Sequence, residues 1–192
     1  MKVLSICGSP RKGNSETLVL FIQSLLKEKG VENEVILLRK RNVGHCKGCV
    51  EYCNKNLECQ QKDDMVEIMK KMEAADGFVF VSPNYFGMPP GIFKNFMDRC
   101  SVFFTANKQN EFSKKKAIVM CVGADEPKYT DRCTNNVVHF CETLGMKVVG
   151  KKSIRSKSEL QNDYNYVLET PHNKGLKEEI EDLVNSHLTA LS

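Results

Sequence analysis

Four cysteines are the residues whose type and spacing most clearly suit chemistry. They follow the pattern Cys46-x2-Cys49-x3-Cys53-x5-Cys59 and belong to a total of nine cysteines in the chain. Four thiolates on one loop are the ligand set of an iron-sulfur cubane, and Gly48 lets the chain turn between them. Zinc also takes four thiolates, and free or disulfide-forming thiols are a third interpretation. The compact spacing favours a [4Fe-4S] cluster over both alternatives.

A second candidate site is the stretch CGSPRKGNSETL, which connects an apolar strand to an apolar helix. It departs from the triphosphate-binding loop, because Asn14 stands where that loop needs lysine and no later strand ends in an acidic residue for magnesium. It also departs from the dinucleotide fingerprint, because Pro10 stands where the second glycine is needed. The stretch therefore predicts a site for a single terminal phosphate.

The helix that follows this stretch would offer the phosphate its positive dipole end and its unpaired amides. A phosphate monoester carries about −1.5 to −2 charges near neutral pH. The side chains that we expect around it are those of Ser9, Arg11, Ser15 and Thr17. The alternative interpretation is that Asn14 or Ser15 only caps the helix.

A third candidate segment is SPNYFGMPPG, residues 82–91, which suits a flat ring. Its prolines stiffen the loop, and Gly87 allows the backbone to approach a ligand closely. Tyr85 and Phe86 offer aromatic faces or edges to such a ring. The alternative is that both aromatic side chains are packed as plugs.

These segments must be positioned by the elements between them. Hydrophobic patterns predict amphipathic helices, a polar loop at 155–173, and strands at 2–7, 33–39, 76–82, 116–122 and 146–154. Alternating strands and helices predict an α/β fold, a flavodoxin-like doubly wound five-stranded parallel sheet in the order 2-1-3-4-5 with helices on both faces. The loops after strands one, three and four should meet at the ligand site. We expect one domain over 1–192, with the cysteine loop inserted at about 40–62.

The order of short motifs along the chain is similar to that of a known family. GSPRKGNSETL, DDM, ADG, SPNYFG and FMDR follow one another within most of residues 1–150. In these motifs the chain resembles the flavodoxin-fold NADPH-dependent FMN reductases. With its cysteine loop it looks most like the iron-sulfur flavoproteins, whose motif has one residue fewer between the second and third cysteines. The resemblance implies FMN as the cofactor.

The resemblance also implies which residues hold the cofactor. The FMN phosphate would be held by Ser9, Arg11, Asn14, Ser15 and Thr17. The ring would be held by Pro83, Asn84, Tyr85, Phe86 and Gly87, with backbone amides near its pyrimidine edge and its N5 side. The family has a glycine-rich turn after strand four, of which only Gly123 remains here. A homodimer or homotetramer that brings cluster and flavin together is implied in the same way.

Composition limits the other functions. With 41% hydrophobic and 27% charged residues among 192, the chain matches an ordinary globular protein. Its net charge of +4 is spread along the chain, so we expect no nucleic-acid partner. Because no apolar run has the length of a membrane span and no leader precedes the first strand, we expect a cytoplasmic protein without a membrane partner. Five further cysteines lie in apolar patterns and are expected to be structural: Cys7, Cys100, Cys121, Cys133 and Cys141.

The sequence contains no set of side chains suited to nucleophilic or acid-base catalysis, and Asp63 and Asp64 are expected to begin a helix. If FMN is bound, the flavin carries the chemistry. We therefore expect an FMN-dependent oxidoreductase or electron-transfer protein that relays electrons between the cluster and FMN, with a ferredoxin-like donor and a small acceptor. The first alternative is an NAD(P)H-dependent FMN or quinone reductase without a cluster. The second is a zinc-binding interaction domain without flavin.

Overall fold

Five parallel strands form the central sheet of the computed structural model, which describes residues 1–156 and 167–192. The strands are hydrogen-bonded in the order β2-β1-β3-β4-β5, and every neighbouring pair is parallel. Their bounds are β1 (Lys2–Cys7), β2 (Glu32–Leu37), β3 (Gly77–Pro83), β4 (Lys116–Gly123) and β5 (Lys147–Arg155). The predicted flavodoxin-like fold is therefore confirmed.

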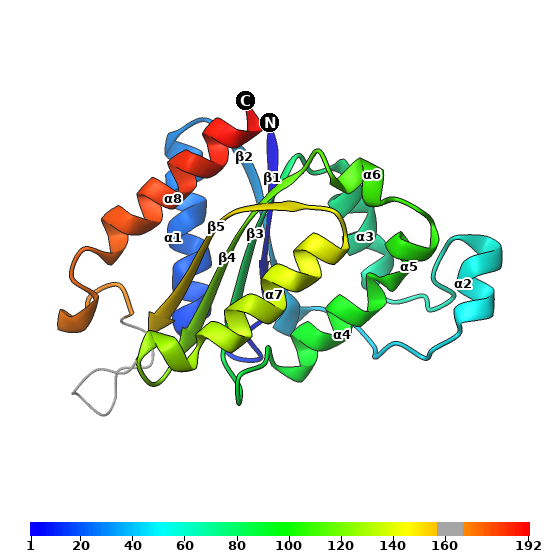
Figure 1. Cartoon of the computed structure of the whole chain (residues 1–192), viewed down its shortest axis with the longest axis horizontal. Helices are drawn as coiled ribbons and strands as arrows, with labels where there is room; N and C mark the ends of the chain where they lie inside the picture. The colour runs from blue at the N-terminus through cyan, green and yellow to red at the C-terminus, as the bar shows by residue number, and fades with distance from the viewer. Residues whose placement is uncertain (157–166) are drawn as a thin grey trace.

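Helices cover both faces of this sheet (Figure 1). One face carries α1 (Asn14–Glu28) and α8 (Leu176–Leu191). The other carries α3 (Met65–Ala74), α4 (Gly91–Arg99), α7 (Asp131–Thr143) and the short helices α5 (Ser101–Thr105) and α6 (Gln109–Phe112). Helix α2 (Val50–Asn56) lies at the periphery, beside α5 (Figure 1). Single turns of 3-10 helix occur at Leu38–Lys40, Pro127–Tyr129 and Pro171–Asn173.

The strand sequences explain why the sheet is covered twice. Successive side chains of a strand point to opposite faces, so an uninterrupted apolar strand buries both. Val79 packs with the α1 and α8 side, whereas Phe78 and Phe80 pack with the α3, α4 and α7 side. The rings of Phe78 and Phe80 are stacked, with centroids 5.6 Å apart. Packing on both faces holds the central strands in place, and the loops at their carboxyl ends are held with them.

The structure differs from the sequence prediction mainly in the connections. Residues 40–62 were expected to form a loop, but they contain the two-turn helix α2. The short helices α5 and α6 were not predicted either. Of the predicted polar loop at 155–173, residues 157–166 lie outside the described residues. None of the helices in the described ranges has both the length and the apolar character needed to cross a bilayer.

The five cysteines outside the cysteine loop are buried, as predicted: Cys7, Cys100, Cys121, Cys133 and Cys141. Burial raises the pKa of Cys7 to about 11. Burial also raises the pKa of Cys141. Because a thiol with a raised pKa keeps its proton near neutral pH, Cys7 and Cys141 act as small apolar residues.

Candidate functional site

A pocket lies at the carboxyl ends of the central strands, where the loops after β1, β3 and β4 meet. The strand order predicts these three loops at the switch point. The predicted residues that line the pocket are Ser9, Arg11, Asn14, Ser15, Pro83, Asn84, Tyr85 and Gly123. The predicted residues outside its lining are Thr17, Phe86 and Gly87, and the lining residues that were not predicted are Gly13, Val122, Ala124 and Ser156.

The loop that leads from β1 into α1 is held on two sides. The amide of Gly8 donates to the carbonyl of Val81 at 2.8 Å, which ties the loop to β3. A β-carbon on Gly8 would lie 2.5 Å from Phe93 Cγ, so α4 can pack here only against glycine. The Ser9 hydroxyl donates to the Arg11 carbonyl at 2.7 Å and accepts from the Arg11 amide at 3.3 Å. This serine turn shapes the bend before α1.

The first turn of α1 faces the pocket. Gly13 precedes the helix, and within the described residues no side chain caps this end. The first amides of a helix have no partner inside it, so here they can donate to an anion. Asn14 and Ser15 are the first helical residues, and Asn14 Oδ1 accepts from the Val167 amide at 3.3 Å. The interpretation that Asn14 or Ser15 caps the helix is therefore wrong. In the same turn, the Thr17 hydroxyl donates to the Gly13 carbonyl at 3.4 Å.

A carboxylate lies in the same turn of α1. Arg39 donates from Nε and Nη2 to the two oxygens of Glu16, at 2.8 and 3.0 Å. The hydrogen bond from Arg39, supported by the charges of Arg39, Lys40 and Lys12, lowers the pKa of Glu16 although burial opposes it. The charge of Glu16 is thus balanced locally, so it does not repel an anion at the helix end.

A tight turn follows β3. The Tyr85 amide donates to the Met88 carbonyl at 2.8 Å, and the Met88 amide donates back at 3.0 Å. Between them Phe86 and Gly87 both have left-handed backbone, with φ of 54° and 80°, which is the pattern of a type I′ turn. Phe86 is fully exposed, and the left-handed conformation costs a non-glycine residue about 1–2 kcal/mol. Asn84 offsets this by accepting the Gly87 amide at 2.8 Å.

Gly123 ends β4 at the pocket wall. The amide and the hydroxyl of Ser156 both donate to its carbonyl, at 2.7 and 2.9 Å. On its other side the Thr130 hydroxyl is buried and has no hydrogen-bond partner among the described residues. Ser156 was missed because it follows a strand without any recognisable motif, 33 residues from Gly123.

The cysteine loop holds two of its thiols on one helical turn. Helix α2 begins after Cys49, and the Cys53 amide donates to the Cys49 carbonyl at 3.1 Å. Residues four apart lie on the same side of a helix, so the additional residue between these two cysteines fits the helical turn. Leu57 ends α2 with φ of 55°, and Cys59 follows two residues later.

The four thiols of this loop differ in environment. Cys46 is exposed, Cys49 and Cys53 are half-buried, and Cys59 is buried. Burial, and then the neighbouring Cys49, Cys59 and Cys46, raise the pKa of Cys53. The thiols are therefore neighbours. Among the described residues, however, no three His, Cys, Asp or Glu side chains are grouped closely enough to hold one metal ion.

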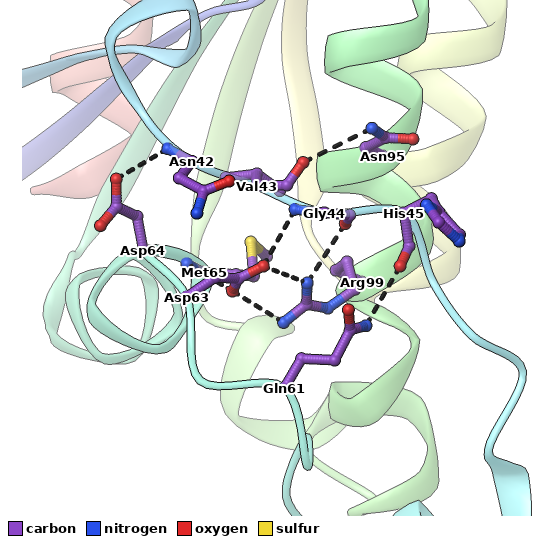
Figure 2. A network of polar contacts seen from close by, with 10 residues as sticks. All are labelled: Asn42, Val43, Gly44, His45, Gln61, Asp63, Asp64, Met65, Asn95 and Arg99. Carbon is purple, nitrogen blue, oxygen red and sulfur yellow. Dashed lines mark hydrogen bonds and ion pairs between the residues drawn. The ribbon is translucent and has the colours of Figure 1, made fainter.

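One buried ion pair joins the two ends of the cysteine loop (Figure 2). Arg99, at the end of α4, donates to both oxygens of Asp63 at 2.7 and 2.9 Å. It also donates to the Gly44 carbonyl at 3.1 Å, and the Gly44 amide donates to Asp63 at 2.9 Å. Asp63 accepts the Met65 amide at 3.1 Å and so stands at the start of α3, as predicted. Its pairing with Arg99 was not predicted.

The fold and the pocket define a class of protein, a flavodoxin-like α/β protein with an open helix end at its switch point. A family model described as NADPH-dependent FMN reductase matches residues 1–159. The chain therefore belongs to the NADPH-dependent FMN reductase family.

Curated relatives of the chain are named iron-sulfur flavoproteins. An iron-sulfur flavoprotein of Methanosarcina thermophila is 32% identical over 154 residues, which cover 80% of this chain and 79% of the relative. An iron-sulfur flavoprotein of Archaeoglobus fulgidus is 43% identical over 99 residues, which cover 52% of this chain and 48% of the relative. The chain thus matches about half the length of the second relative and most of the first.

Solved structures share the fold. The FMN-dependent NADH-azoreductase of Bacillus anthracis, in complex with FMN, has a TM-score of 0.70 and 17% identity, covering 96% of this chain and 98% of its own. The NAD(P)H:quinone oxidoreductase of Methanothermobacter marburgensis has a TM-score of 0.65 and 17% identity, covering 100% of this chain and 94% of its own. At these identities the likeness establishes the fold alone.

Proposed function

We propose that this protein is an FMN-dependent electron-transfer oxidoreductase that relays electrons between a [4Fe-4S] cluster and FMN to a small acceptor. The observation that carries the proposal is the pocket at the strand ends, which the open end of α1 and the turn after β3 both line. Bound FMN would supply the electron-accepting ring, while the protein supplies position and electrostatics.

The phosphate end of FMN would lie at the start of α1. The chemistry of the donors supports this, because uncapped helical amides, hydroxyls and a guanidinium suit a dianion. The residues that we assign to the phosphate are Ser9, Arg11, Asn14, Ser15 and Thr17. Balancing of Glu16 by Arg39 keeps the local charge favourable to that anion.

The ring of FMN would lie toward the turn after β3 and the end of β4. The residues that we assign to it are Pro83, Asn84, Tyr85, Phe86, Gly87 and Gly123. The lining of the pocket supports this placement, because Pro83, Asn84, Tyr85 and Gly123 all belong to it. The exposed Phe86, held in a strained conformation, is typical of a functional turn.

The cluster would be held by Cys46, Cys49, Cys53 and Cys59. Their number and type fit a cubane, and Cys49 and Cys53 already share one side of α2. The four thiols would close into one coordination shell when the cluster forms, as metal binding and local folding are coupled. The printed name of the Methanosarcina thermophila relative, iron-sulfur flavoprotein, supports the same assignment.

A second candidate function is an NAD(P)H-dependent FMN or quinone reductase that uses FMN without a cluster. It is favoured because, within the described residues, no three of the four thiols are grouped closely enough to hold one metal ion. A zinc-binding interaction domain is the third candidate, in which the same four thiols would bind the metal.

We further propose that the protein takes electrons from a ferredoxin-like donor and works as a homodimer or homotetramer. Exposed apolar side chains support an assembly. Tyr85, Phe86 and Tyr129 are exposed near the pocket, and Leu57 and Phe104 are exposed near the cysteine loop. Contact between these two surfaces of neighbouring subunits would bring cluster and flavin together.

One preparation separates these functions. Protein purified without oxygen is analysed for iron, acid-labile sulfide, zinc and FMN, and its absorption spectrum is recorded. We expect one FMN and about four irons and four sulfides per chain. FMN without iron would favour the reductase, whereas zinc without FMN would leave only the interaction domain.

A further inference from the structure

Arg99 is a deeply buried charged side chain that contacts the cysteine loop from outside it. Its side chain is 1% exposed, and that of Asp63 is 11% exposed. Figure 2 shows that it comes from α4, whereas Gly44 and Asp63 lie on the two segments that enter and leave the loop. A bidentate, buried pair of this kind fixes geometry more strictly than an exposed ion pair.

Two further contacts close the same loop (Figure 2). The amide of Asn42 donates to Asp64 at 2.8 Å, and the Asp64 amide donates to the Asn42 carbonyl at 3.1 Å. Gln61 donates to the His45 carbonyl at 3.1 Å. These contacts join the two segments to each other, while Arg99 joins both to the rigid helix α4. Helix α4 therefore holds the loop chiefly through Arg99, and Asn95 of the same helix adds one longer contact by donating to the Val43 carbonyl at 3.5 Å (Figure 2).

One of the four loop cysteines, Cys59, is buried as well. Although burial lowers the pKa of Arg99, its hydrogen bond with Asp63 and the charge of Cys59 raise it. The Nε of Arg99 is buried and has no hydrogen-bond partner among the described residues. A cluster-bound sulfur accepts hydrogen bonds, and such bonds are one way in which a protein sets the reduction potential of a cluster.

We propose that Arg99 is a positioning residue for the cysteine loop. Together with Asp63 it holds the two ends of the loop against α4, and its Nε donates to the sulfur of Cys59 when the cluster is bound. This inference rests on the proposed function for its second part, because that part needs a cluster. The first part concerns the chain itself.

The first test uses hydrogen exchange of the full-length protein without cluster. The variants are Arg99→Lys, which keeps the charge but loses the bidentate contact, Arg99→Met, which loses both, and Asp63→Asn. The matched control is Arg39→Lys, which weakens the bidentate Arg39–Glu16 pair at the other site. We expect amide exchange in residues 45–62 to rise roughly tenfold or more in the Arg99 variants, because a buried pair has lost a partner. Arg39→Lys should leave this segment unchanged.

The second test uses anaerobically reconstituted protein. We expect Arg99→Met to bind less iron per FMN than wild type and to lower the reduction potential of the cluster that remains. Arg99→Lys should recover part of the potential, because its charge stays near Cys59. FMN content near that of wild type verifies that the variants are folded.

Each outcome decides one part. Exchange in 45–62 that is unchanged in Arg99→Met and Arg99→Lys, or equally raised in Arg39→Lys, would overturn the positioning role. A cluster potential unchanged in Arg99→Met would overturn the contact with Cys59. If wild type binds FMN but no iron, the proposed cluster and the Cys59 contact both fail, while exchange in the protein without cluster still decides the positioning role.

Discussion

A β-carbon on Gly123 would lie 2.0 Å from Oγ1 of Thr130. No side chain fits in that space, so the end of β4 and the start of α7 meet at the pocket wall only because residue 123 is glycine. The contact therefore requires glycine at position 123.

Substitution Gly123→Ala tests this contact. We expect it to lower the free energy of unfolding by about 1–3 kcal/mol, as overpacking does, and to weaken FMN binding. Denaturant unfolding and flavin fluorescence titration measure the two effects. The double variant Gly123→Ala/Thr130→Ala should recover part of the stability, because it removes the clashing oxygen. Strict additivity of the two changes would contradict the proposed clash.

Arg11 provides the sharpest test of the phosphate site. We expect Arg11→Ala to weaken FMN binding by about 1.5–3 kcal/mol, the usual size of a charged hydrogen bond. The neighbouring Lys12→Ala is the matched control, since Lys12 is exposed and is not part of the pocket lining. Equal losses in both variants would indicate a diffuse charge effect instead of a specific contact.

Cys53→Ala tests the cluster ligands. Because three thiolates cannot complete the ligand set, we expect this variant to lose its iron while FMN stays bound. Iron and FMN contents measure both. Cys141→Ala removes a buried cysteine on α7 and should lower stability without loss of iron. Full iron content in Cys53→Ala would remove this residue from the ligand set.

His187 gives the stability a pH dependence. Its Nε2 lies 3.0 Å from the Lys116 carbonyl, and its Nδ1 is buried without a hydrogen-bond partner among the described residues. Burial lowers its pKa below the ordinary 6.5. At mildly acidic pH the unfolded chain therefore binds a proton at His187 that the folded chain does not bind. The free energy of unfolding falls as the pH drops below 6.5, by at most about 1.4 kcal/mol per pH unit.

Urea unfolding between pH 5 and 8 measures this effect. We expect His187→Gln to be less sensitive to pH than wild type, because glutamine does not titrate. His139→Gln replaces an exposed histidine and should keep the wild-type slope. A slope that is the same in all three proteins would exclude His187 as its source.

The fold was predictable because each strand is an apolar run and each long helix has an apolar stripe. The largest difference at a strand is β2, expected at 33–39 and found at Glu32–Leu37. Helix α2 was not predicted, because none of its residues is buried and its sequence therefore shows no helical repeat of apolar residues. Helices α5 and α6 are too short for a period to be visible.

The pocket residues that lie in short sequence motifs were predictable. Ser9, Arg11 and Tyr85 lie in loops directly after strands, and the strand order brings those loops together. Ser156 and the pairing of Asp63 with Arg99 depend on contacts between distant segments. No local pattern records such contacts, which appear only when the elements pack.

Helix α4 connects both candidate sites through its length. It begins at Gly91, two prolines after the turn that follows β3, and ends at Arg99, about 12 Å further along its axis. Each residue of an α-helix advances the side chains by about 100° around that axis. One inserted residue would leave the turn after β3 in place but rotate Arg99 away from Asp63. The rotation of residues about the axis of this one helix thus links the geometry of the turn after β3 to that of the cysteine loop, and both fix the length of the helix.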